Sequence, residues 1–295
     1  MLKHTIRHTT LAAAMLFTAL AGGQAHADSK SDSPYTTERR TVAPFSSIHL
    51  GIPYQVIVTA DSGNTVELSG PRDQLAEIET TVSGDTLTVR RPSHNGWSFQ
   101  FNSGKHGKPP LTVRISAANL KLLRNGGSGD VDLQQFRGNA LTLVSSGSGD
   151  VQASGDTRAL TVNASGSGDL DLSKLKAASL DIIASGSGDI NATGVTTDLN
   201  VAVSGSGDIG VTDIRAGQVN ATVRGSGDIT LTGSAREVHA ELSGSGELDA
   251  HGLSTGQADV KVRGSGEATV RLNDKGGRER LVTYERKSSR ERSVN

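Results

Sequence analysis

The sequence predicts an all-β protein, a right-handed parallel β-helix (β-solenoid) with coils of about 20 residues. Three observations lead to this prediction. The tetrapeptide Gly-Ser-Gly-Asp, or Gly-Ser-Gly-Glu, occurs eight times at spacings that alternate between 20 and 19 residues. Between the copies, Val, Ile, Leu and Ala recur at every second position, which indicates strands. The repeats contain no proline and no helical spacing of apolar residues, and a fixed period of this length is typical of solenoids.

Residues 1–27 are predicted to be a secretory signal peptide. Lys3 and Arg7 precede an apolar run that is too short to span a bilayer, and Ala-His-Ala at 25–27 fits a cleavage site. The mature protein is therefore expected to begin near Asp28 and to be exported, to the periplasm, the cell surface or the medium. Residues 28–41 are polar and are predicted to form a flexible leader.

Residues 42–272 form the predicted β-helix domain, in which 42–125 are irregular opening coils. A basic segment at 90–110 interrupts these coils and holds the only tryptophan. In it, Trp97, Phe99 and Phe101 alternate, so all three rings would lie on one face of a short strand. They could form an aromatic platform for a glycan or a partner protein. Shielding of the open end of the solenoid is the interpretation that we favour.

Residues 126–272 form the regular coils. In each coil a short strand follows the acid, then a polar turn, then a longer strand that alternates apolar and polar side chains. The alternation places both glycines of the tetrapeptide on the inward side, where a side chain would collide with a bend, and places the serine and the acid outside. The predicted corner glycines are Gly127, Gly129, Gly147, Gly149, Gly166, Gly168, Gly186, Gly188, Gly205, Gly207, Gly225, Gly227, Gly244, Gly246, Gly264 and Gly266.

The acids of the eight corners should form an outer ladder. They are Asp130, Asp150, Asp169, Asp189, Asp208, Asp228, Glu247 and Glu267. Carboxylates one strand apart repel, so solvent screening, backbone hydrogen bonds or bound cations must relieve the repulsion. A calcium column is the metal-binding hypothesis, and these eight acids are its candidates. Only one corner per coil carries the motif, and no second acid faces the first, which favours a structural corner.

The remaining composition excludes several classes of function. Removing Lys3 and Arg7 from 30 basic residues leaves 28 against 31 acidic ones, a net charge of −3, which does not suggest nucleic-acid binding. The chain has no cysteine and no run that could span a membrane. The histidines lack zinc-site spacing, no G-x-S-x-G nucleophile motif occurs, and no cofactor is expected. Residues 273–295 are predicted to be a polar, partly disordered tail whose beginning could form a final strand.

The stretches "RTVAPFSSIHLGIPYQVIVTADSGNTVELSG" and "LAEIETTVSGDTLTVR", followed by repeated "SGSGDI", carry a family resemblance. Over residues 42–272 the chain resembles the bacterial family described as putative auto-transporter adhesin, head GIN domain. The resemblance implies a parallel β-helix at the cell envelope and supplies no catalytic residues. We therefore expect a non-catalytic exported envelope protein that binds an envelope protein or a glycan. The alternatives are a glycan-active enzyme of the β-helix type and a calcium-binding solenoid.

Overall fold

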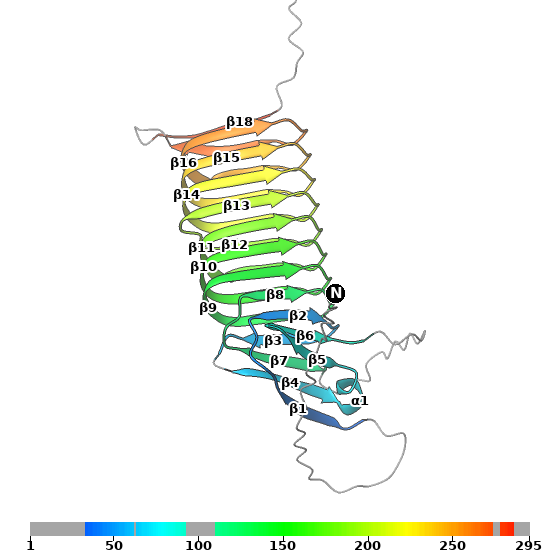
Figure 1. Cartoon of the computed structure of the whole chain (residues 1–295). Coiled ribbons are helices and arrows are strands. Elements are labelled where there is room, and N and C mark those ends of the chain that lie inside the picture. The colour runs from blue at the N-terminus through cyan, green and yellow to red at the C-terminus, as the bar shows by residue number, and fades with distance from the viewer. Residues whose placement is uncertain (1–32, 62, 93–109, 274–277, 286–295) are drawn as a thin grey trace, which may run out of the picture.

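The computed structural model confirms the predicted fold class. It is 67% strand and 2% helix and contains a parallel β-solenoid of about eight turns, with coils about 20 residues apart (Figure 1). The predicted signal peptide and the rings of Trp97, Phe99 and Phe101 lie outside the described residues. The structure describes residues 33–61, 63–92, 110–273 and 278–285.

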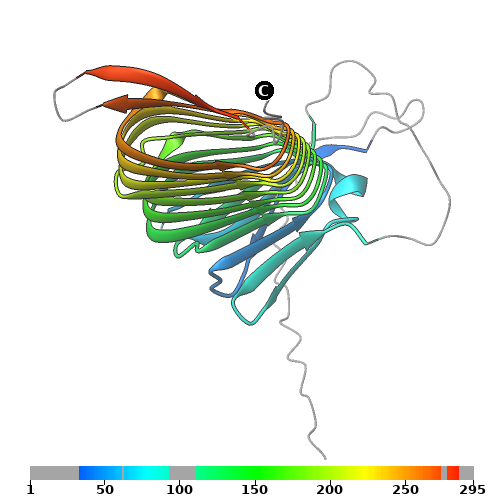
Figure 2. The same cartoon turned by 90° about the horizontal axis from the view of Figure 1, so that it is seen from above.

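The regular coils are long strands that stack in parallel. Leu160, for example, lies in register between Leu141 of the preceding coil and Leu180 of the following one. The strands are β9 (Val131–Ser145), β10 (Val151–Ala164), β11 (Leu170–Ala184), β12 (Ile190–Thr193), β13 (Asp198–Val203), β14 (Ile209–Val223), β15 (Ile229–Leu242) and β16 (Leu248–Val262). Figure 2 shows the coils from above, nested one behind another with a regular offset.

The polar turn predicted inside each coil is a bend within a continuous strand, except between β12 and β13. The reason is that neighbouring coils keep exchanging backbone hydrogen bonds around the bend, with one irregularity of register. The 20-residue coils place an extra residue here: Gln135 and Asp213 have φ of 53° and 52°. In the 19-residue coils, Gly155 and Gly233 have φ of 131° and 130°. The tetrapeptide spacing therefore alternates between 20 and 19 residues because every second coil has one extra residue, a β-bulge, at this bend.

The core is a column of aliphatic side chains at alternate positions of each strand. Leu141, Leu143 and Val151 are all nearly inaccessible to solvent, as the alternation predicts. The only aromatic residues in the buried core of the described chain are Phe45 and Phe136. Thin layers of Val, Leu, Ile and Ala thus fill the interior, which accounts for the low aromatic content.

The opening region, predicted as irregular coils over 42–125, does not wind in sequence order. β2 (Ser47–Gly51) and β3 (Gln55–Thr59) form a coil that pairs in parallel with β8 (Leu122–Asn125) and with β9. On its other side lie β6 (Thr86–Arg90) and β7 (Thr112–Ala117), which come later in the chain.

Antiparallel strands complete this end of the molecule. β4 (Asn64–Pro71) pairs with β7 and with β1 (Tyr35–Thr41), while β5 (Glu79–Ser83) forms a hairpin with β6. A four-residue helix, α1 (Arg72–Leu75), follows β4. These pairings shield the last parallel coil from further strand addition.

The prediction of a flexible leader over 28–41 is wrong for residues 35–41. These residues form β1, all seven of which pair with β4. Arg40 secures the strand, because its guanidinium donates to the Ile78 carbonyl oxygen at 2.8 Å and to Thr80 Oγ1 at 2.7 Å. The polar composition of residues 35–41 does not indicate a strand, because β1 pairs with β4 through its backbone and buries no side chain in the core.

At the other end, β17 (Ala268–Asn273) starts a new coil, and β18 (Glu279–Tyr284) returns antiparallel to it. This agrees with the expectation that the beginning of the polar tail could form a final strand. The described part of the chain contains no helix with the length and hydropathy needed to cross a membrane.

Candidate functional site: the repeated corner and the outer faces

Glycine is required at the corners by the close stacking of coils. A Cβ placed on Gly147 would lie 1.8 Å from the carbonyl oxygen of Gly127, and one on Gly168 would lie 2.2 Å from that of Gly149. No corner glycine has the left-handed φ that favours glycine. A side chain here would collide with backbone, and the backbone that it would meet belongs to the corner of the preceding coil.

The serine of each corner and seven of the eight acids are exposed to solvent, as predicted; the exception is Glu247. Ser148 and Asp150 are exposed, whereas Gly149 between them is buried and Gly147 is half-buried. The two outward rows run along the whole stack at this edge of the solenoid. The corner therefore presents hydroxyls and carboxylates, one of each per coil.

Six of the eight acids, Asp130 through Asp228, are each tied to the next coil through their own side chains. The Asp169 backbone N–H donates to Asp150 Oδ1 at 2.9 Å, and the Asp189 N–H donates to Asp169 Oδ1 at the same distance. Equivalent bonds join the acids from Asp130 through Asp228 to the backbone of Glu247. Of the three ways to relieve the repulsion in the ladder, backbone hydrogen bonding is the one that the structure shows.

The ladder changes character where Asp is replaced by Glu. Glu247 is half-buried, and burial, followed by the nearby carboxylates of Glu267, Asp228 and Asp249, raises its pKa above the ordinary value. Ionisation of Glu247 is therefore disfavoured by its burial and by the neighbouring carboxylates.

Metal binding by the ladder gains no geometric support. In the described part of the chain, no three His, Asp or Glu side chains are grouped so that they could hold a metal ion. Calcium binding by the eight acids stays a prediction, and the observed bonds of the acids give them a structural role.

The histidines of the regular coils lie on outer faces beside carboxylates. His239 Nε2 lies 3.0 Å from Glu237, and His251 contacts Asp249. Both side chains are partly exposed to solvent, and neither contacts a serine hydroxyl that it could activate. Surface ion pairs of this kind contribute little to stability.

Sequence reasoning missed a surface hollow of about 270 Å³ at the bend of three successive coils. It is lined by Asp132, Gln134, Gln135, Gln152, Ala153, Ser154, Asp171 and Lys174. The 19-residue coil supplies the middle of the hollow, and the 20-residue coils on either side supply its walls. The alternation of coil lengths was the signal in the sequence that could have located it.

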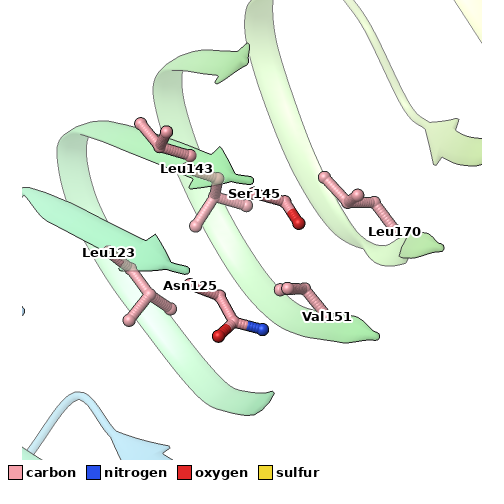
Figure 3. Close-up of a pocket in the computed structure, with 7 residues that line it drawn as sticks. Leu123, Asn125, Leu143, Ser145, Val151 and Leu170 are labelled. Atoms are coloured by element: carbon pink, nitrogen blue, oxygen red, sulfur yellow. The ribbon is translucent and has the colours of Figure 1, made fainter. Parts of the chain in front are cut away.

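A second space, inside the solenoid, cannot serve as a ligand site. It lies between Leu123, Leu143, Val151 and Leu170 and is too small to admit a water molecule (Figure 3). The buried Asn125 beside it is fully engaged: its amide donates to the carbonyl oxygens of Gly129 and Gly149, and its oxygen accepts the Gly127 N–H.

The outer faces of the described chain carry few large apolar side chains. Those that are exposed are Tyr35, Ile183 and Leu281, which lie far apart in the sequence. Ile183 is flanked on the adjacent strands by Asn163 and Ala202. The outer faces of the described chain therefore present mainly polar groups.

These features define a repeat protein of the parallel β-solenoid class, with polar outer faces and hydrogen-bonded corners. The model of the family described as "Putative auto-transporter adhesin, head GIN domain" matches residues 44–212, 141–232 and 192–276. The chain belongs to this family, and the membership supports an adhesin-like role.

Solved structures share the fold at low sequence identity. A putative adhesin from Parabacteroides merdae is 18% identical with a TM-score of 0.61, and a putative lipid binding protein from Parabacteroides distasonis is 21% identical with a TM-score of 0.59. A putative adhesin from Bacteroides fragilis is 20% identical with a TM-score of 0.51. Each comparison covers 79% of this chain and 95% of the other. No curated protein matches the chain.

Proposed function

We propose that this protein is an exported, non-catalytic component of the cell envelope that uses the outer faces of its solenoid to bind an envelope glycan or protein. The proposal combines the family membership with the signal peptide expected at residues 1–27. The observation that carries it is the regular stack of coils, which keeps polar side chains at fixed positions along a rigid surface.

The hydrogen bonds made by the ladder acids support a non-catalytic role. A general acid or base must be able to exchange a proton with a substrate. In the ladder, Asp130 through Asp228 each use one carboxylate oxygen to accept a backbone N–H of the next coil, so that oxygen is engaged within the fold. Such carboxylates suit a structural role better than proton transfer.

The test is retention of the purified mature protein, residues 28–295, on whole cells, isolated envelope polysaccharides and envelope proteins, with heat-unfolded protein as the control. Retention of the folded protein alone is the expected result. Failure to bind any of these materials would refute the binding role. Cell fractionation, with protease treatment of intact cells, would distinguish the periplasm from the surface.

Catalysis is tested separately by incubation with acidic polysaccharides and assay of released reducing ends. We expect no turnover. Turnover that disappears when Asp150, Asp169 and Asp189 are changed to Asn would make the protein a glycan-active enzyme.

A further inference from the structure

We propose that the surface hollow at the bend of the coils at 131–150, 151–169 and 170–189 binds one saccharide unit of an uncharged glycan. This inference rests on the proposed function and assigns its ligand class and its site. It is carried by the shape of the hollow, by the side chains that line it, and by the hydrogen bonds that hold those side chains in place.

The shape follows from the difference in coil length. Between Ala153 and Gly155 the 19-residue coil has only Ser154, whereas the preceding coil has Gln134 and Gln135 between the register partners of these two residues. The longer coils on either side place Gln135 and Lys174, both exposed, at the rim. At about 270 Å³, the hollow is smaller than most drug-sized pockets, which begin at roughly 300 Å³. It therefore suits a single ring.

The lining offers mainly acceptors and carboxamides. In the strand register, Gln152 lies between Asp132 and Asp171, so a carboxamide is flanked by two carboxylates. Carboxylates accept hydrogen bonds from hydroxyl groups, and a carboxamide both donates and accepts. Adjacent hydroxyls of a sugar ring present this combination of donors and acceptors.

Several of these groups are fixed before any ligand arrives. Gln134 Nε2 donates to Asp132 Oδ2 at 2.6 Å, and Asp171 Oδ1 accepts both the backbone N–H and the hydroxyl of Ser173. Ser154 Oγ accepts the Gln135 N–H at 3.1 Å, which holds the bulge in place. The carboxamide of Gln152 makes no hydrogen bond to another described residue and faces solvent. A rigid rim with a free amide reduces the cost of ordering on binding.

Charge and hydrogen bonding disfavour other ligands. Two carboxylates against one ammonium make the hollow slightly negative, so an acidic sugar would be repelled. Strand addition by a peptide requires an open sheet edge, whereas the middle coil is paired on both sides. No aromatic ring lines the hollow, so we expect weak binding per site, in the millimolar range.

The test is ligand-detected NMR of the mature protein with cellobiose, maltose, lactose and N,N′-diacetylchitobiose, and with glucuronic acid as the acidic comparison. The variant Gln152→Ala/Lys174→Ala removes the free groups of the hollow. Its control, Thr230→Ala/Lys176→Ala, removes the same charge from exposed positions: Thr230 occupies the place of Gln152 in another 19-residue coil.

We expect at least one neutral sugar to bind, with an affinity reduced about tenfold or more in the hollow variant and unchanged in the control. Three results would each overturn the assignment: no binding of any neutral sugar, equal binding by both variants, or preferential binding of glucuronic acid. If the hollow variant still adheres to cells or envelope material as wild type does, the proposed function stands and the hollow is not its site.

Discussion

Replacing a single corner glycine by alanine should loosen the stack by an amount that follows from the corner geometry. In Gly168→Ala the new Cβ would start 2.2 Å from the Gly149 carbonyl oxygen, whereas real Cβ contacts essentially never fall below 3.0 Å. The two coils must therefore separate locally by about 0.8 Å. That shift stretches the adjacent bonds from Ser167 N–H to the Gly147 oxygen (3.1 Å) and from Asp169 N–H to Asp150 Oδ1 (2.9 Å). At about 1 kcal/mol for the first bond and about 1.5–3 kcal/mol for the charged one, the expected loss is about 2.5–4 kcal/mol.

Urea unfolding followed by far-UV circular dichroism measures this loss. Gly256→Ala is the matched control, because a Cβ there meets its nearest neighbour, the Arg236 oxygen, at an ordinary 3.5 Å. We expect Gly256→Ala to leave the unfolding midpoint unchanged or to raise it slightly, since alanine restricts the unfolded chain. If Gly168→Ala unfolds at the same urea concentration as Gly256→Ala, coil stacking is not the reason for glycine at the corners.

Four further changes test the same account. Asp169→Asn should change the thermal unfolding temperature little, because the amide oxygen can still accept the Asp189 N–H, whereas Asp169→Ala should cost about 0.5–2 kcal/mol, the lost bond of about 1.5–3 kcal/mol less the relieved repulsion of about 1 kcal/mol; equal losses in both would point instead to a bound cation. Ser145→Val should stabilise by about 1 kcal/mol in urea unfolding, because the buried Ser145 hydroxyl has no hydrogen-bond partner and lies in an apolar setting; a destabilised variant would contradict this. Glu267→Gln should lower the pKa of Glu247 toward its ordinary value of 4.5, measured by NMR titration; an unmoved titration would show that the Glu267 carboxylate does not contribute to the raised pKa. Since a raised folded-state pKa means that ionised Glu247 destabilises the fold, wild type should lose stability as pH rises through that pKa, and less so in Glu267→Gln.

The sequence allowed the solenoid and the facing of its side chains to be predicted, because both depend on local periodicity. The two-residue alternation correctly placed Ser148 and Asp150 outside and Leu141 and Val151 inside. It could not show where the Cβ of Gly147 would point relative to the coil below, since that depends on the rise between coils.

Other features depend on pairing between distant segments, which a single sequence does not reveal. The sequence of β1 resembles a leader because its pairing partner, β4, lies more than twenty residues away and none of its side chains is buried in the apolar core. The same holds for β6 and β7, which pass beyond β2 and β3 to form an earlier layer of the stack. To predict the hollow, one must know both that the coil lengths alternate and where in the coil the extra residue lies. The sequence shows the first and not the second.

The choice of an acid at every corner can be decided by comparing two magnitudes. Two carboxylates one coil apart, about 4.8 Å, repel by about 1 kcal/mol in water, and salt reduces this further. A hydrogen bond from a backbone N–H to an ionised carboxylate contributes about 1.5–3 kcal/mol, and each aspartate from Asp130 to Asp228 accepts one. The bonds outweigh the repulsion because the acids face solvent. At the half-buried Glu247, burial raises the pKa first, and the nearby carboxylates of Glu267, Asp228 and Asp249 raise it further. The exposed edge therefore stabilises the stack with the same side chains that make its surface polar.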